Sequence, residues 1–204
     1  MVYMLGCGGN CKIVIDICKA NNIEVQGIYD DKFEKEIVIY DEVKLIGKIK
    51  DIPACSVVIN SIGTGRIRKL IFERLKEKHL FWLNCVHPNV IISDTVKLGE
   101  GNIICNGVII NSDTQIGNYN LINTCAIIEH DCKIGDFNDI APRSTICGTV
   151  TMKDLNFLGV SSTIIQNINL ESNIIIGAVG LVIRNITESG TYVGIPVKKL
   201  IKKV

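Results

Sequence analysis

Residues 91–136 read IISDTVKLGEGNIICNGVIINSDTQIGNYNLINTCAIIEHDCKIGD. Counting every sixth residue from Ile92 gives an aliphatic side chain at sixteen consecutive positions, and the next residue is often glycine or another small residue. The sixteen positions are Ile92, Leu98, Ile104, Ile110, Ile116, Ile122, Ile128, Ile134, Ile140, Ile146, Met152, Leu158, Ile164, Leu170, Ile176 and Val182.

A period of six matches neither the helical repeat of about 3.6 residues nor the alternation of a half-buried strand. It is typical of a three-sided parallel β-helix, in which one short strand and one corner together use six residues. The repeated aliphatic residue then points into the prism, and we expect the residue after it to turn the corner, where glycine is favoured. Residues 90–185 are predicted to form about five uninterrupted coils. The alternative, a β-sandwich, would alternate with period two and turn every 8–12 residues or so.

The N-terminal part lacks this period. Its apolar patterns predict strands at 2–5, 24–29 and 56–60, helices at 10–22 and 66–78, and a closing segment at 81–86. This order is typical of a small parallel sheet of Rossmann type. The predicted fold is therefore an α/β Rossmann-like domain at residues 1–86, followed at residues 87–204 by an all-β left-handed parallel β-helix with a C-terminal tail.

Composition excludes several classes of protein. The 204 residues carry a net charge of +1 with mixed acids and bases, which argues against a nucleic-acid or membrane surface. No apolar run approaches the ~20 residues of a membrane span, and the first residues lack a basic signal-peptide segment. The nine cysteines include no CxxC pair. We interpret them as reduced thiols, without disulfides or metal, and expect a cytoplasmic protein.

Glycines and acids mark a candidate nucleotide site in the first domain. The loop Gly6-Cys7-Gly8-Gly9 precedes the first helix, and backbone N–H groups at both helix starts can hold phosphates. Asp30 and Asp31 end the second strand, where they can accept hydrogen bonds from a ribose or a base. A domain this small fits a mononucleotide or a sugar nucleotide better than a dinucleotide. A purely structural glycine turn remains the alternative.

Only one of the three histidines lies in a chemically suggestive pattern. His79 ends a predicted helix and is expected to be solvated, and His87 belongs to the domain junction. His130 lies two residues after the inward-pointing Ile128, so it should project from a corner of the prism. Imidazole is suited to general-base catalysis, and the adjacent Asp131 can orient it. A solvated corner without chemistry is the alternative.

The chain resembles a known family at this segment. The resemblance spans residues 2–200 and rests on the motif at 123–137, the loop at 6–9, the Asp30-Asp31 pair, residues 60–68, His87-Pro88 and residues 192–196. The chain is similar to the sialic-acid O-acetyltransferase and UDP-4-amino-sugar N-acetyltransferase family of hexapeptide-repeat acyltransferases. That resemblance implies a homotrimer with active sites between neighbouring prisms, acetyl-CoA as acyl donor, and no metal.

The resemblance also implies roles for individual residues. His130 would be the base and Asp131 its partner, and Asn123 would touch the acceptor sugar. The nucleotide site would be lined by Gly8, Gly9, Asn10, Asp30, Asp31, Ile62 and Gly63. Acetyl-CoA would run near Asp139, Gly148, Val160, Gly177 and Ala178, with Lys198 or Lys199 available to its phosphates.

The chain departs from the family pattern at three positions. Asn10 stands where the family often has histidine, and Asp139 stands where it often has a second histidine near acetyl-CoA. Arg143 replaces a glycine. One expectation is that Asp139 and Arg143 pair with each other, and another is that they mark a different donor or acceptor.

The leading functional prediction is acetyl transfer from acetyl-CoA to the amine of a UDP-4-amino-4,6-dideoxy sugar, by direct attack in a ternary complex. The alternatives are O-acetylation of sialic acid or a related sugar, and a non-catalytic sugar-nucleotide-binding homologue. A carbonic anhydrase of the γ type is disfavoured, because it needs three histidine ligands and the predicted β-helix supplies one.

Overall fold

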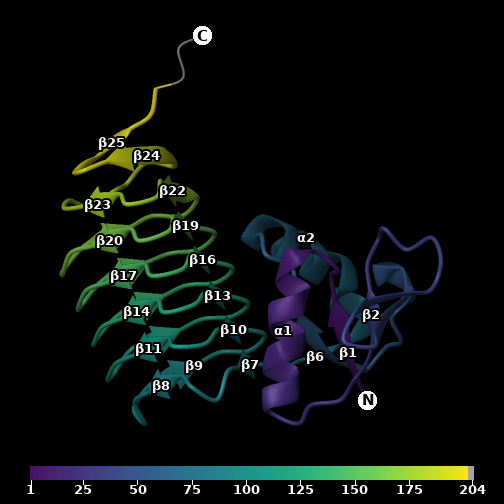
Figure 1. Cartoon of the computed structure of the whole chain (residues 1–204). Helices are drawn as coiled ribbons and strands as arrows, with labels where there is room; N and C mark the ends of the chain where they lie inside the picture. The colour runs from purple at the N-terminus through teal and green to yellow at the C-terminus, as the bar shows by residue number, and fades with distance from the viewer. Residues whose placement is uncertain (202–204) are drawn as a thin grey trace.

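The structure is a computed structural model that describes residues 1–201, so the last three residues of the predicted second domain lie outside the described residues. A three-sided stack of short strands stands beside an α/β domain, and helix α1 (Gly9–Ala20) lies between the stack and the sheet of that domain (Figure 1). Within residues 1–201, no helix is both long enough and apolar enough to cross a membrane.

The α/β domain contains one six-stranded sheet in the order β3-β4-β2-β1-β5-β6. Only β3 and β4 pair antiparallel, so the predicted parallel sheet of Rossmann type is confirmed. The sequence did not predict the antiparallel pair, because only two of its nine residues are buried and they show no clear alternation. The elements are β1 (Val2–Leu5), β2 (Val25–Tyr29), β3 (Ile37–Tyr40), β4 (Val43–Gly47), β5 (Val57–Asn60), α2 (Gly65–Leu75) and β6 (Phe81–Trp82), with 3-10 turns at Ile49–Asp51 and Lys76–Lys78.

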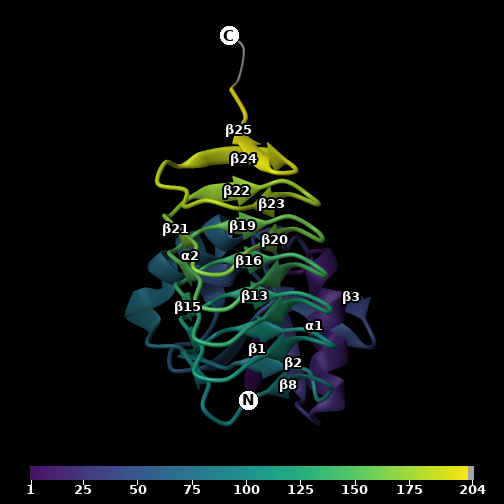
Figure 2. The same ribbon diagram turned by 90° about the vertical axis from the view of Figure 1, so that its left-hand side faces the viewer.

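The prism has three faces, and each face is a sheet of parallel strands in which a strand pairs with the strand one coil later (Figure 2). Face 1 consists of β7 (Cys85–Val86), β10 (Ile103–Ile104), β13 (Leu121–Ile122), β16 (Asp139–Ile140), β19 (Phe157–Leu158) and β22 (Ile174–Ile176), extended by β24 (Gly190–Gly194) and β25 (Val197–Lys199). Face 2 consists of β8 (Ile91–Ile92), β11 (Ile109–Ile110), β14 (Ile127–Ile128), β17 (Thr145–Ile146), β20 (Thr163–Ile164) and β23 (Leu181–Val182). Face 3 consists of β9 (Lys97–Leu98), β12 (Gln115–Ile116), β15 (Lys133–Ile134), β18 (Thr151–Met152) and β21 (Asn169–Leu170). Corners 1, 2 and 3 are the turns that follow the strands of faces 1, 2 and 3.

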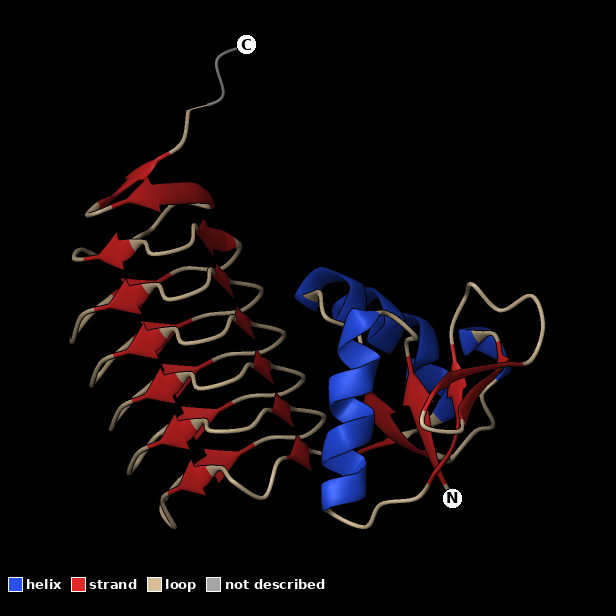
Figure 3. Ribbon diagram, viewed as in Figure 1, coloured by secondary structure: helices blue, strands red, loops and turns tan. Residues whose placement is uncertain are grey.

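The predicted β-helix is confirmed, with five full coils and part of a sixth (Figure 3). From Ile104 to Val182, every residue of the sixfold series is at most 4% exposed, and these side chains form one continuous core. The prism already begins at β7, which lies in the segment predicted to close the first domain.

The glycines after the aliphatic positions have a different role from the one expected. The left-handed backbone falls two residues later, as at Asp113 (φ +60) and Tyr119 (φ +57), where most residues are not glycine. Gly117 instead permits close stacking, because a Cβ there would lie 2.2 Å from Asp136 Oδ1 and 2.8 Å from Gly135 O of the next coil. Glycine therefore sets the contact between coils, while the corner accepts ordinary residues in the left-handed region.

An asparagine ladder runs inside the prism and was not predicted. Asn84, Asn102, Asn120, Asn138 and Asn156 follow one another at intervals of eighteen residues, and each side-chain oxygen accepts the backbone N–H of the corresponding residue one coil later, at 2.8 Å. These bonds satisfy backbone donors that the buried corner 3 would otherwise leave unpaired.

Replacing Asn120 by alanine should destabilise the protein by about 2–4 kcal/mol, because the buried N–H of Asn138 loses its acceptor and a void forms. Denaturant unfolding measures the change. Asn106→Ala is the matched control, since that asparagine is exposed on another corner, and it should change stability by less than about 0.5 kcal/mol. Equal effects of the two substitutions would contradict the role given to the ladder.

Apolar packing of both helices joins the domains. Helix α1 packs on the lower part of face 1, where Val14 and Cys18 share a core with Ile103 and Leu121. Helix α2 packs on corner 3 through aromatic rings, with Phe72 tilted against Tyr119 at 4.8 Å, ring centre to ring centre. Among residues 1–201, the α/β domain is therefore held along face 1 and corner 3, and faces 2 and 3 are left free of it.

Candidate functional site

His130 and Asp131 lie on corner 2 and project outward, as the repeat predicted. Their side chains are 60% and 57% exposed, and His130 Nδ1 lies 2.8 Å from Asp131 Oδ2. Asp131 occupies the left-handed region (φ +60), which turns its carboxylate toward the ring. With the Nδ1 proton held by this carboxylate, Nε2 keeps its lone pair and is the nitrogen that can accept a proton.

A glycine on the next coil leaves room for the His130 ring. Gly148 lies one coil later, and a Cβ on it would approach His130 Cε1 to 2.6 Å and Nε2 to 2.7 Å. The structure therefore brings together three of the predicted residues, His130, Asp131 and Gly148. The preceding residue, Glu129, is also held in place, because Asn111 Nδ2 donates to its Oε2 at 2.7 Å.

A cavity of about 410 Å³ opens in the α/β domain at the carboxyl ends of its strands. It gathers every residue that the sequence predicted for the nucleotide part of the site: Gly8, Gly9, Asn10, Asp30, Asp31, Ile62 and Gly63. Its remaining lining residues are Gly6, Lys32, Ile49, Ser61, Thr64, Ile67 and Ile71. Ile49, Ile67 and Ile71 provide an apolar wall that sequence reasoning did not find, because Ile49 comes from a 3-10 turn and the other two from α2, far apart in the sequence.

The two aspartates of this cavity, Asp30 and Asp31, have different hydrogen-bond partners. Asp30 accepts the backbone N–H of Cys7 and of Lys32, both at 2.8 Å, so it holds the glycine loop against the second strand. Burial and then the hydrogen bond to Asp30 raise the pKa of Cys7 to about 11. Asp31 pairs with Arg74 at 2.7 Å, and this hydrogen bond lowers the pKa of the Asp31 carboxyl. Asp31 is half-exposed and keeps room to accept a hydroxyl of a ligand.

The two helix starts are not equivalent. Helix α1 begins without a side-chain cap at Gly8, and a Cβ on Gly8 or Gly9 would meet no atom within 4 Å. Its N–H groups therefore face open cavity, which favours an anion there. Helix α2 begins at Gly65, whose N–H already donates to Asp139 Oδ2 at 2.8 Å. Of the two starts expected to hold phosphates, the start of α1 is the one that the protein leaves open.

The expected pair of Asp139 with Arg143 is wrong. Asp139 lies on face 1 beneath α2, where Arg68 Nη2 approaches its Oδ1 to 2.6 Å, whereas Arg143 is exposed on corner 1. Burial raises the pKa of Asp139 and Arg68 counteracts it. The sequence could not reveal this pair, because Arg68 and Asp139 come from different domains.

Of the residues predicted to contact acetyl-CoA, Gly148 lies against His130, but Val160, Gly177 and Ala178 lie apart from it. These three, and Asn123 predicted for the acceptor sugar, belong to corner 1, which a full face of the prism separates from corner 2. Lys198 lines a separate cavity of about 280 Å³ near the end of the stack, together with Arg184 and Lys199. A single chain therefore does not bring these residues to His130. Among residues 1–201, no three His, Cys, Asp or Glu side chains lie close enough together to hold a metal ion.

Three comparisons place this geometry among known proteins. Residues 1–75 match the family described as the PglD N-terminal domain. A mutant of the GDP-perosamine N-acetyltransferase from Caulobacter crescentus, solved with CoA and GDP-perosamine, is similar with a TM-score of 0.91 and 28% identity, over 98% of this chain and 97% of that chain. The acetyltransferase domain of PglB from Neisseria gonorrhoeae, solved with acetyl coenzyme A, shares the fold with a TM-score of 0.87 and 22% identity, over 98% of each chain.

A curated relative adds a partial match. An uncharacterized protein of Acanthamoeba polyphaga mimivirus is 36% identical over 105 residues, which are 50% of this chain, and the chain spans only 21% of that protein's length.

The relative solved with CoA and GDP-perosamine agrees with the prediction of an acyltransferase that takes acetyl-CoA as co-substrate. The resemblance to the hexapeptide-repeat sugar acetyltransferases is therefore confirmed: residues 1–75 match the PglD N-terminal domain, and they stand in front of a left-handed parallel β-helix.

Proposed function

We propose that this protein transfers an acetyl group from acetyl-CoA to the amine of a sugar linked to a nucleoside diphosphate. The observation that carries the proposal is the cavity at the open start of α1, which gathers all the predicted nucleotide-site residues in a chain built like a GDP-perosamine N-acetyltransferase along 98% of its length. The diphosphate would bind at Gly8 and Gly9, and Asp31 would accept from a hydroxyl of the nucleotide.

The chemistry assigned to corner 2 is general-base catalysis. His130 Nε2 takes a proton from the acceptor amine as the amine nitrogen attacks the thioester carbonyl. The new N–C bond forms, the C–S bond breaks, and the CoA thiolate leaves and is protonated. Asp131 holds the imidazole by its Nδ1 and stabilises the imidazolium that forms.

The finer identity of the acceptor belongs to the same proposal. The family resemblance favours a UDP-4-amino-4,6-dideoxy sugar, whereas the solved relative from Caulobacter crescentus binds GDP-perosamine. Ile49, Ile67 and Ile71 supply an apolar wall suited to either base. We retain the UDP-linked sugar as the expected acceptor, and a cytoplasmic location goes with it.

We further propose a homotrimer. Face 2 presents the apolar column Ile91, Ile109 and Ile127, and Ile91 is 65% exposed, whereas face 3 presents Lys97 and Lys133. An uncovered apolar face suits contact between copies of the chain. Packing face 2 against neighbours would bring corner 2 of one chain toward corner 1 of the next, and so complete the site that one chain lacks.

The direct test is incubation with acetyl-CoA and a panel of UDP-, GDP- and dTDP-linked amino sugars, read by release of the CoA thiol and by the mass of the sugar product. We expect one member of the panel to gain a single acetyl group. Thiol release with free sialic acid, and none with any nucleotide-linked sugar, would contradict the proposal in favour of O-acetylation.

Gly9→Ala provides a separate check of the nucleotide cavity. Because Gly9 is the first residue of α1 and a Cβ there points into open space, alanine should leave folding intact or slightly stabilise the helix. It should weaken sugar-nucleotide binding about tenfold or more, because the methyl group occupies the place of the phosphates. Calorimetry measures binding, and unchanged affinity in the folded variant would refute this phosphate position.

A further inference from the structure

A buried ion pair joins the two domains and has no part in the chemistry proposed above. Arg68 on α2 is 2% exposed and Asp139 on face 1 is 7% exposed, with 2.6 Å between Arg68 Nη2 and Asp139 Oδ1. Taking two charges out of water is costly even when they are paired, so such a pair is weak support for stability alone. The hydrogen bonds around the pair indicate a second role.

Arg68 connects the prism to the wall of the nucleotide cavity. Its Nε donates to Tyr119 O at 2.8 Å and its Nη2 donates to Asn138 O at 2.9 Å, and both acceptors belong to the prism. Its Nη1 donates to Ile62 O at 3.1 Å, and Ile62 lines the cavity. The guanidinium is a planar group with fixed donor directions, so these bonds together fix the distance from the prism to the cavity wall.

Asp139 holds the same wall from the other end. Its Oδ2 accepts the N–H of Gly65 at 2.8 Å, and Thr64 gives α2 no side-chain cap, so the prism supplies the negative charge that a helix start favours. A Cβ on Gly65 would lie 2.0 Å from Phe137 O, so only glycine permits this approach. Gly65, Arg68 and Asp139 therefore determine how closely α2 docks on the prism.

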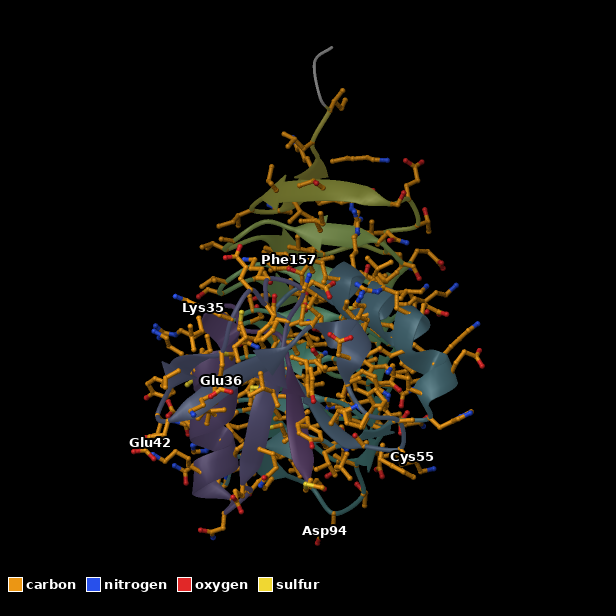
Figure 4. The ribbon with its side chains drawn as sticks, turned by 90° about the vertical axis from the view of Figure 1, so that its right-hand side faces the viewer. Lys35, Glu36, Glu42, Cys55, Asp94 and Phe157 are labelled. Atoms are coloured by element: carbon orange, nitrogen blue, oxygen red, sulfur yellow. The ribbon has the colours of Figure 1, made fainter. Side chains whose placement is uncertain are left out.

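The loop fixed in this way separates two cavities. Thr64 lines both the nucleotide cavity and a second cavity of about 360 Å³. The second cavity lies against face 1 and is lined by Asp139, Phe137 and Phe157, the last of which is labelled in the view from the side of the α/β domain (Figure 4). A ligand anchored in the first cavity would have to pass this loop to reach the prism.

We infer that Arg68 and Asp139 are positioning residues for the acceptor: the pair sets the loop at 62–65 against the prism, so that a nucleotide held in the α/β domain presents its sugar at a fixed place on the prism. The inference rests on the proposed function and deepens it. It also gives Asp139 a role different from a contact with acetyl-CoA, the role that the family resemblance implied.

The test compares Asp139→Asn with Arg68→Lys. Asparagine can still accept from Gly65 N–H but leaves Arg68 without its counter-charge, and lysine keeps the charge without the fork. We expect KM for the sugar nucleotide to rise about tenfold in Asp139→Asn, with KM for acetyl-CoA unchanged, and to rise less in Arg68→Lys. Ser144→Ala is the matched control, because it removes a buried hydrogen bond of the prism, from Ser144 Oγ to Gly159 O at 2.9 Å, without touching the loop. It should change neither KM.

Direct calorimetry keeps the two proposals separate. If the wild-type protein binds no sugar nucleotide, the proposed function fails. If the wild type binds and folded Asp139→Asn binds equally well, with equal KM, the positioning role is overturned. If Asp139→Asn does not fold, Arg68→Lys decides in its place, and an unchanged KM for the sugar nucleotide in that variant overturns the inference. Faster hydrogen exchange at 62–65 in a folded variant, with the prism unchanged, would support it.

Discussion

His130→Ala should lower kcat for acetyl transfer by about 10²–10⁴-fold while both substrates still bind. The imidazole is 60% exposed and bonds only to the neighbouring Asp131 among described residues, so its removal should leave the free energy of unfolding unchanged. Asp131→Asn keeps the size of the partner but not its charge, and should lose less activity, about ten- to a hundredfold. Steady-state kinetics with saturating acetyl-CoA measures both losses.

His79→Asn serves as the control for His130→Ala. His79 is the exposed histidine after α2, it has a left-handed backbone (φ +49), and asparagine tolerates that conformation. This variant should keep full activity. Full activity of His130→Ala itself would refute the assignment of the base and favour the non-catalytic, sugar-nucleotide-binding alternative.

Two inactive variants should restore activity to each other when their chains are mixed. Ala178→Trp is expected to block the proposed acetyl-CoA groove at corner 1, and His130→Ala removes the base at corner 2. If each site combines corner 1 of one chain with corner 2 of its neighbour, every trimer that contains both variants keeps one of its three sites intact, because one neighbouring pair in the ring combines the two undamaged corners. Coexpression with two different tags, followed by assay of the doubly purified protein, measures the recovery.

The double variant, with both substitutions in one chain, is the control for this mixture. Mixed with the wild type, it contributes no corner of either kind to a working site. Absence of recovery in the His130→Ala and Ala178→Trp mixture would show that both corners act within one chain, or that corner 1 holds no donor. Activity of Ala178→Trp by itself would contradict the proposed donor position directly.

The prism could be predicted because its buried aliphatic residues recur every six positions in the sequence. Sixteen aliphatic positions in one phase leave only one way to bury them, and the buried series from Ile104 to Val182 follows it. The asparagines of the ladder also recur, at an interval of eighteen residues, but asparagine is mostly an exposed residue, so this spacing alone does not predict a buried ladder. The strands β3 and β4 carry no such repetition.

The candidate site was predictable in parts. The cavity proposed for the nucleotide could be predicted because the ends of parallel strands meet at one edge, so Gly8, Asp30 and Ile62 had to converge. The partner of Asp139 could not be found in this way. It depends on how the two domains dock, which is set by the close approach at Gly65 and by aromatic packing, and neither leaves a local pattern. Asp139, which departs from the family pattern, pairs with Arg68 and accepts the N–H of Gly65, and so links the two domains.

The central claim is that the α/β domain binds the nucleotide and delivers the sugar to His130 on the β-helix. The most direct test of this claim compares two acceptors. The measurement is kcat/KM for a nucleotide-linked amino sugar and for the same amino sugar without its nucleotide, each with acetyl-CoA. Binding energy from the nucleotide should favour the linked sugar by about 10³-fold or more, because that energy orients the amine at the reacting carbonyl. Equal kcat/KM for the two acceptors would contradict the central claim that the α/β domain delivers the acceptor to the β-helix.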